Sequence, residues 1–213
     1  MPGPRARWRS LRAALAPPYW QEVLRAVGPA ETVLDVGCGA SSPLVRGRFE
    51  RLVGVDAFPG AVAAARALGA HDELHEHDVR RLDELFEPRS FDAVVAVDLL
   101  EHLEPGEGVA LLDSMERIAR CRVVVFTPNG FVVQGDREGN PFQVHRSGWT
   151  PTQLRTRHYR VTGVHGLRPL RGEEAAIRFR PRRAWALAAD LTQPLVRRVP
   201  RLAYHLLAVK DVA

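Results

Sequence analysis

One segment of the sequence, Val33 to Ser41, has residue types and an order that suit a nucleotide-binding loop. It reads VLDVGCGAS, so an apolar stretch ending in Asp35 is followed by Gly37 and Gly39. Glycine has no Cβ atom, which lets the backbone approach a ligand closely, and a helix start beyond the turn would offer free N–H groups. Two glycines alone are also typical of a tight turn between a strand and a helix.

A second acidic residue follows at a spacing that suits a ribose. Asp56 ends the next apolar stretch, 21 residues after Asp35, where a carboxylate can accept hydrogen bonds from both ribose hydroxyls. A dinucleotide-binding motif is disfavoured because the third glycine of its GxGxxG pattern would fall on Ser42.

A third group is the run Asp98-Leu99-Leu100-Glu101-His102. On a helical turn, Asp98, Glu101 and His102 would share one face. Two carboxylates and an imidazole are suitable ligands for a divalent metal ion. The alternative is that these side chains only form the floor of a pocket.

Apolar stretches that alternate with helix-like segments must position these residues. The strands are expected at 32–37, 51–56, 73–78, 91–98 and 122–127, with helices at 58–68, 80–86 and 106–119, and two further strands at 158–164 and 203–210. This alternation predicts an α/β fold, a doubly wound, mostly parallel sheet with helices on both faces. Thr150, Pro151 and Gln153 predict the start of a helix over 152–157.

Four aspartates close the expected strands: Asp35, Asp56, Asp78 and Asp98. Ligands of open α/β sheets bind at the carboxyl ends of the strands, so the four carboxylates are candidate ligand contacts.

The DxGxG loop, Asp56 and the pair Asp78–Val79 together resemble class I S-adenosylmethionine-dependent methyltransferases of the type 11/12-like group, from about Thr32 to Val125. The resemblance implies a Rossmann-like sheet of seven strands whose last hairpin is antiparallel, and S-adenosylmethionine as the cofactor. It implies cofactor-binding roles for the following residues: Asp35, Gly37, Cys38 and Gly39 at the methionine moiety, Asp56 with Ala57 at the ribose, Asp78 and Val79 at the adenine, and Asp98 at the pocket wall.

The D-x-x-E-H run is similar to the metal-ligating E-x-x-E-H run of two groups in this superfamily, the ubiquinone-pathway O-methyltransferases and the plant-type small-RNA 2′-O-methyltransferases. The second group also has a Thr-Pro-Asn and a histidine-containing stretch before a Trp-Thr helix start, which here are Thr127–Asn129 and His145–Thr150. The resemblance implies that Asp98, Glu101, His102 and His145 hold a divalent metal ion. A site without metal is the other interpretation.

Methyl transfer requires an aligned acceptor and removal of its proton, because the sulfonium is already a strong electrophile. His145, His102 and Glu101 are the candidate catalytic residues, and neutral histidine suits a base. N-methylation of nucleobases is disfavoured because the Asp/Asn-Pro-Pro-aromatic run of those enzymes is absent after the strand at 91–98.

We therefore expect transfer to an oxygen of a small polar or sugar-like molecule. The alternatives are an RNA 2′-O-methyltransferase and a non-catalytic cofactor-binding partner subunit.

Charge is unevenly distributed along the 213 residues. Residues 1–130 carry 15 arginines and 19 acidic residues, whereas 131–213 carry 14 arginines and one lysine against 6 acidic residues. The interpretation is a single domain with a helical cap at 1–30, a cofactor-binding core at 31–127 and an acceptor side at 128–213. Nucleic acid is a possible but less favoured partner of the basic part.

Neither a transmembrane segment nor a secretory signal is expected, so the protein is predicted to be cytoplasmic, with reduced Cys38 and Cys121. Residues 182–199 place Trp185, Ala188, Leu191 and Leu195 at helical spacing, interrupted by Pro194. This insert could be a membrane-surface element, the face of a homodimer, or a helix that covers the pocket or the sheet edge.

Overall fold

The computed structural model describes residues 15–135, 140–172 and 175–212, and its centre is a seven-stranded sheet. The strand order is β3-β2-β1-β4-β5-β7-β6. The strands are β1 Thr32–Val36, β2 Arg51–Asp56, β3 Glu73–Glu76, β4 Phe91–Val97, β5 Ala119–Pro128, β6 Arg160–Leu167 and β7 Ala203–Asp211. Strands β1 to β5 are parallel, and β7 runs antiparallel between β5 and β6. The predicted doubly wound, mostly parallel sheet is confirmed.

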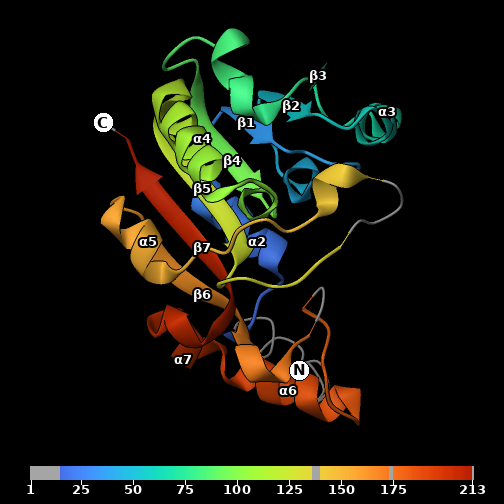
Figure 1. Cartoon of the computed structure of the whole chain (residues 1–213), viewed down its shortest axis with the longest axis vertical. Helices are drawn as coiled ribbons and strands as arrows, with labels where there is room; N and C mark the ends of the chain where they lie inside the picture. The colour runs from blue at the N-terminus through green and yellow to red at the C-terminus, as the bar shows by residue number, and fades with distance from the viewer. Residues whose placement is uncertain (1–14, 136–139, 173–174, 213) are drawn as a thin grey trace, which may run out of the picture.

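The central strands are apolar on both faces because helices cover both faces (Figure 1). Leu34 and Val94 belong to the cluster that packs with α4, Pro105–Ile118, whereas Val33 and Val95 belong to the cluster that packs with α2, Tyr19–Val27. Side chains of successive strand residues point to opposite faces, so a continuous run of valines fills two cores at once.

The other helices are α3 Pro59–Leu68, α5 Pro151–Thr156, α6 Arg182–Leu191 and α7 Gln193–Arg198. Helix α5 starts as predicted, since the Thr150 side chain accepts from the Gln153 N–H and the Gln153 side chain accepts from the Thr150 N–H. None of the described helices is long and apolar enough to cross a membrane.

One helix prediction differs from the structure, and another is made more exact by it. The segment predicted as a helix at 80–86 is a 3-10 turn, Val79–Glu84. The Asp78 side chain caps this turn by accepting from the Arg80 N–H, and the backbone leaves helical geometry at Arg81. The insert at 182–199 is two helices that separate at Thr192. Pro194 lies in the first turn of α7, where its missing N–H needs no partner.

The N-terminal cap is described only in part. Residues 1–14 of the expected basic helix lie outside the described residues. The described part forms α2, whose Val23 and Val27 are buried against the sheet.

Candidate active site

A cavity of about 370 Å³ lies at the carboxyl ends of β1, β2 and β4. It brings together most of the residues that the sequence assigns to the cofactor: Asp35, Gly37, Cys38, Gly39, Asp56, Ala57, Val79 and Asp98. The end of a parallel strand and the turn after it form one wall, so short local segments supply most of this lining.

The glycine loop is built around two residues with positive φ. Gly37 (φ 69°) donates its N–H to the Val55 carbonyl at 2.8 Å, and a Cβ atom there would lie 2.7 Å from Leu99 Cδ1. Gly39 (φ 57°) has open space where a Cβ would point. At position 37 both the backbone conformation and the packing against Leu99 therefore require a glycine, whereas at position 39 only the conformation favours one.

Asp56 connects this loop to the start of α3. Its Oδ2 accepts from the Gly39 N–H at 2.9 Å and its Oδ1 from the Phe58 N–H at 2.9 Å. Burial raises the pKa of Asp56, while these backbone hydrogen bonds act in the opposite direction. A carboxylate has about four lone-pair sites, so Asp56 can still accept from a ligand hydroxyl beside these backbone donors.

Asp35 has a partner that the sequence did not indicate. Its Oδ2 lies 3.0 Å from Nε2 of His71, and both side chains are almost fully buried. His71 comes from the loop before β3 and belongs to no motif, so only the fold brings it to Asp35. Burial raises the pKa of the neighbouring Cys38 thiol, which keeps it neutral.

Asp78 lies apart from the other predicted cofactor residues. Its side chain accepts from the backbone N–H and the guanidinium of Arg80, and it is absent from the described lining of the cavity. The side-chain hydrogen bonds from Arg80 lower the pKa of Asp78. Val79, the next residue, does line the cavity.

A second cavity of about 300 Å³ adjoins the first, and Tyr19, Asp98, His102 and Gln143 line both. Four histidines line this second cavity, namely His102, His145, His165 and His205. Glu101 and Tyr204 add further polar groups, and Phe126 and Val132 add apolar ones. A molecule bound in the second cavity would thus lie beside a molecule bound in the first cavity.

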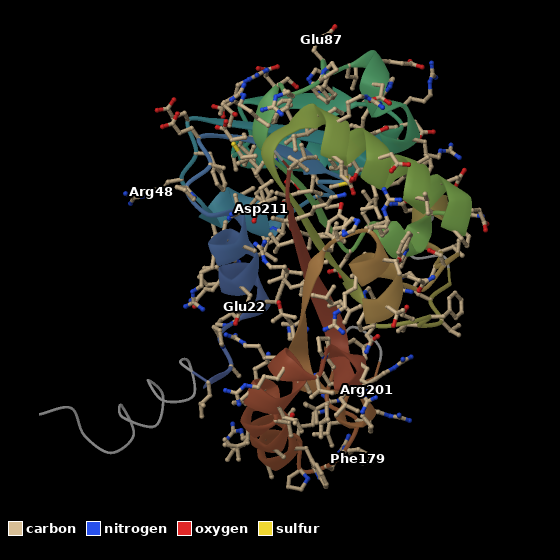
Figure 2. The ribbon with its side chains drawn as sticks, turned by 90° about the vertical axis from the view of Figure 1, so that its left-hand side faces the viewer. Glu22, Arg48, Glu87, Phe179, Arg201 and Asp211 are labelled. Carbon is tan, nitrogen blue, oxygen red and sulfur yellow. The ribbon has the colours of Figure 1, made fainter. Side chains whose placement is uncertain are left out.

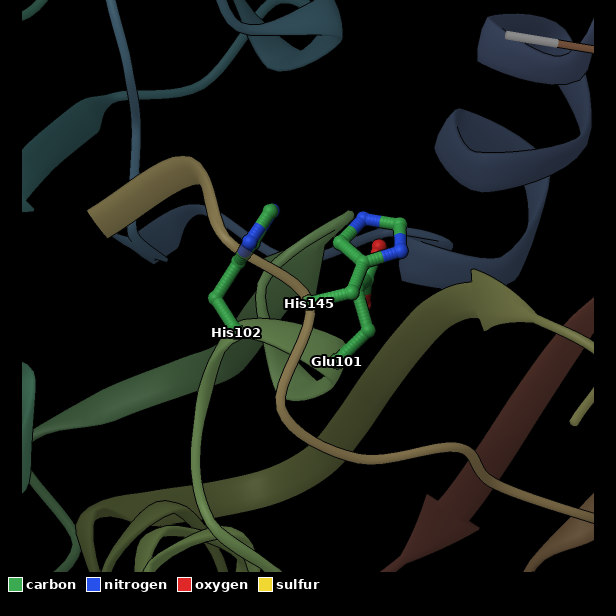
Figure 3. Close-up of side chains that lie close together, drawn as sticks. All are labelled: Glu101, His102 and His145. Carbon is green, nitrogen blue, oxygen red and sulfur yellow. The ribbon is translucent and has the colours of Figure 1, made fainter. Parts of the chain in front are cut away.

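Glu101, His102 and His145 form a compact group in this cavity (Figure 3). One potential ligand atom from each lies within 4.8 Å of the others. Nδ1 of His102 is 3.3 Å from the Val144 carbonyl oxygen, and Nδ1 of His145 is 2.6 Å from the Val132 carbonyl oxygen. Because a carbonyl only accepts, each Nδ1 carries the proton, so Nε2 is the ring atom of each histidine that could act as a metal ligand.

The loop that carries His145 is fastened to the turn that carries Glu101. The Glu101 carbonyl accepts from the backbone N–H groups of Arg146 and Ser147, at 2.8 and 3.0 Å. The Leu100 carbonyl accepts from the Ser147 hydroxyl and the Trp149 indole. These bonds explain why two segments more than forty residues apart in sequence place their side chains together.

Thr127 holds the Glu101 carboxylate. Its hydroxyl donates to Oε2 of Glu101 at 2.9 Å, in a fully buried contact. Desolvation and the nearby Asp98 raise the pKa of Glu101 well above its ordinary value. One oxygen of Glu101 is therefore held by Thr127.

Asp98, the fourth residue expected at a metal site, is separate from this compact group. It follows β4 with a left-handed φ of 48°, and the carboxylate faces both cavities. Its Oδ1 lies 3.7 Å from Nε2 of His205. The pKa of Asp98 is raised by its surroundings in the two cavities, although 47% of the side chain is open to solvent.

The pair His165 and His205 was not indicated by the sequence. Their Nδ1 atoms are 2.8 Å apart, and His205 stacks on Phe126 with ring centroids 4.7 Å apart. A shift in the register of β6 between Val164 and Leu167 accompanies a positive φ of 70° at His165. Such irregularities in a strand change the direction of its side chains, and this one is at His165, which lines the second cavity.

Residues 33–121 match the family model "Methyltransferase domain". This chain contains a class I S-adenosylmethionine-dependent methyltransferase domain. The methyltransferase uses S-adenosylmethionine as its methyl donor. No curated protein matches the chain.

Solved structures share the fold of the methyltransferase at low sequence identity. A SAM-dependent methyltransferase from Archaeoglobus fulgidus is 14% identical with a TM-score of 0.59, over 95% of this chain and 93% of that one. The methyltransferase domain of bacterial CtHen1 is 20% identical with a TM-score of 0.55, over 91% and 95%. Magnesium protoporphyrin IX methyltransferase from Synechocystis PCC 6803, solved with bound SAM, is 15% identical with a TM-score of 0.53, over 92% and 80%.

Proposed function

We propose that this methyltransferase transfers the methyl group of S-adenosylmethionine to an oxygen of a small polar acceptor in the histidine-lined cavity. The observation that carries the proposal is the group Glu101, His102 and His145, whose ligand atoms lie within 4.8 Å of one another beside the cofactor cavity. An acceptor hydroxyl placed there would be next to the methyl donor. It would also be next to three groups that can accept its proton or hold a metal ion that lowers its pKa.

The cofactor would bind with its ribose at Asp56 and its methionine part along Asp35 and the glycine loop. The Asp56 carboxylate suits the ribose hydroxyls, and the buried carboxylate of Asp35 and the half-buried carboxylate of Asp56 complement the positive sulfonium. Val79 would contact the adenine.

The group at Glu101 fits a divalent metal ion. Both imidazoles have their Nδ1 protons held by backbone carbonyls, the arrangement that orients Nε2 in metal-binding histidines. Glu101 would add an oxygen ligand, steadied by Thr127. When bound, such an ion would lower the pKa of an acceptor hydroxyl. Asp98 would contribute only indirectly, because it lies outside the compact group.

The chain's own residues can also take up the acceptor proton. Burial lowers the pKa of His102 to about 4, so this imidazole is neutral near pH 7 and can accept a proton from a hydroxyl only transiently. Asp98 lines both cavities, and its raised pKa makes it a stronger base than an ordinary carboxylate, so it is a second candidate acceptor for this proton. His145 or His102 would hold the acceptor oxygen if no ion is bound.

The size of the second cavity favours a small acceptor. Its volume of about 300 Å³ is at the lower end for binding sites of drug-sized molecules. Its polar lining offers hydrogen bonds to hydroxyl groups, as expected for a sugar-like molecule.

The cofactor site can be tested by calorimetry with S-adenosylhomocysteine. Asp56→Ala should weaken binding about a hundredfold, because two charge-assisted hydrogen bonds to the ribose are lost. Asp78→Ala is the matched control, and a small effect would remove Asp78 from the adenine site. Unchanged binding in Asp56→Ala would overturn the assignment of this cavity to the cofactor.

The metal site can be tested by titrating Mn²⁺ into the purified protein. Glu101→Gln, His102→Ala and His145→Ala should each weaken Mn²⁺ binding by at least about tenfold, since each removes one ligand. His77→Ala, a histidine outside both cavities, should leave Mn²⁺ binding unchanged. Absence of Mn²⁺ binding by the unchanged protein would contradict a metal-assisted mechanism.

A further inference from the structure

The surface formed by residues 176–202 combines exposed apolar side chains with arginines. Six of the eleven exposed large apolar side chains described in the structure lie here: Phe179, Trp185, Leu187, Leu191, Leu195 and Leu202. Residues 178–202 contain seven arginines and one acidic residue, Asp190. Figure 2 shows Phe179 and Arg201 at the end of the molecule opposite Glu87.

The apolar side chains point away from the body of the protein. Leu187 and Leu191 are four residues apart on α6, so they share one face, and they are 44% and 58% exposed. Ala189, on the opposite face, is fully buried. In α7, Leu195 is half exposed while its neighbour Val196 is buried.

The two helices form a fixed platform on strand β6. Gln193 donates to the Gly163 carbonyl at 2.8 Å and accepts from the Gly166 N–H at 3.0 Å. The Thr192 hydroxyl accepts from the Leu167 N–H. The inner face thus covers the sheet edge, as one of the sequence interpretations expected, and the outer apolar face is held in one orientation.

A shallow groove beside this face has a mixed lining. It is lined by Ala176, Ile177, Ala186 and the two arginines Arg182 and Arg183. Paired guanidinium groups suit a phosphate, and apolar walls suit the first carbons of an acyl chain. The residue before Ala176, Ala175, lines the histidine-lined cavity, so the groove and that cavity are close along the chain.

We propose that residues 176–202 bind the surface of an anionic phospholipid bilayer. Leu187 and Leu191 enter the boundary between headgroups and acyl chains, and Arg182 and Arg183 contact headgroup phosphates. An amphipathic helix with arginines beside an apolar face binds membranes in this way. The inference does not depend on the identity of the methyl acceptor.

Other partners fit this surface less well. In a symmetric dimer the same patch meets itself, which would bring two sets of seven arginines together. Nucleic acid would satisfy the arginines but would leave the outward leucines against a charged backbone. A bilayer accommodates both the charge and the apolar ridge.

The experiment is co-sedimentation of the full chain with vesicles of phosphatidylcholine, alone or mixed with phosphatidylglycerol. We expect binding to the mixed vesicles, weaker binding at higher salt, and little binding to phosphatidylcholine alone. Arg182→Ala/Arg183→Ala should bind roughly thirtyfold more weakly, and Leu187→Ser/Leu191→Ser at least about tenfold more weakly.

A matched control is Arg66→Ala/Leu68→Ser, which changes an exposed arginine and an exposed leucine on α3. The control should bind vesicles like the unchanged protein. All variants should retain S-adenosylhomocysteine binding and their melting temperature, since the changed side chains are exposed.

Three results would overturn the proposal. They are no binding to the mixed vesicles, binding that the leucine and arginine pairs leave unchanged, and binding to single-stranded RNA in place of vesicles. The proposal would also fail if a dimer formed without vesicles and was lost in Leu187→Ser/Leu191→Ser, because this result would assign the surface to a second copy of the chain.

Discussion

The two cavities of this methyltransferase are built in different ways. Most of the lining of the cofactor cavity comes from two short segments, 35–43 and 56–57, each at the end of a strand. The histidine-lined cavity takes single side chains from segments spread between Tyr19 and His205. The cavity at β1 and β2 is formed by similar turns at the ends of neighbouring strands. The histidine-lined cavity exists only because β6, β7 and the loop before α5 come together.

The chemistry of the two cavities differs accordingly. The cavity at the ends of β1, β2 and β4, which we assign to the cofactor, contains the carboxylates of Asp35 and Asp56, and these suit hydroxyls and a positive sulfonium. The second cavity concentrates four histidines beside Glu101 and Asp98, which suit proton transfer or a metal ion. Variants that act on one cavity and spare the other will test this division.

The largest effect is expected from Gly37→Ala. The new Cβ would lie 2.7 Å from Leu99 Cδ1 at a residue with positive φ, so we expect a loss of about 3 kcal/mol in unfolding free energy and weaker S-adenosylhomocysteine binding. Gly39→Ala has only the backbone strain and should cost about 1 kcal/mol. Urea denaturation and calorimetry measure both, and equal losses would show that contact with Leu99 is unimportant.

A smaller change in the free energy of unfolding, this time a gain in stability, is expected from Glu101→Gln in the presence of a chelator. Because burial raises the folded-state pKa of Glu101, the native protein loses stability as pH rises from about 4.5 through that raised pKa. The neutral glutamine avoids this loss and can still accept from Thr127. We expect the variant to be more stable than the unchanged protein by roughly 1–2 kcal/mol near neutral pH, with the difference vanishing in acid.

Thermal unfolding at several pH values measures this difference. Glu76→Gln, at an exposed position on β3, is the control and should show no such pH dependence. Mn²⁺ should stabilise the unchanged protein more than Glu101→Gln. A variant that is less stable than the unchanged protein at every pH would contradict a destabilising role for the buried carboxylate.

The smallest effect is expected from Thr127→Val. This change removes the hydroxyl that donates to Glu101 while keeping the side-chain volume nearly constant. Mn²⁺ binding should weaken about tenfold, with cofactor binding unchanged, because the hydrogen bond only orients a ligand. Thr162→Val, which removes a hydroxyl that donates to the Leu207 carbonyl on β7, should leave Mn²⁺ binding unchanged. Similar losses in both variants would indicate a general effect on the sheet.

Much of the fold was predictable because its signals are local. The valine-rich strands, the turn with Gly37 and Gly39, and the capping box at Thr150 each depend on a few consecutive residues. The 3-10 turn after Asp78 was not predicted, since it depends on a cap and on contacts that a periodic pattern does not contain. The interruption of the insert was predicted at Pro194, and the structure places the break two residues earlier, at Thr192.

The sequence by itself placed Asp35, Gly37 and Gly39 together at the end of one strand, because a strand, its terminal acid and the following glycines are adjacent in the chain. It also placed Glu101 and His102 on one turn. Only the tertiary structure decided that Asp78 bonds Arg80, that His71 meets Asp35, and that His165 and His205 join the second cavity. Those contacts join residues far apart in the chain, or depend on the path of a turn, so they exist only once the sheet has formed.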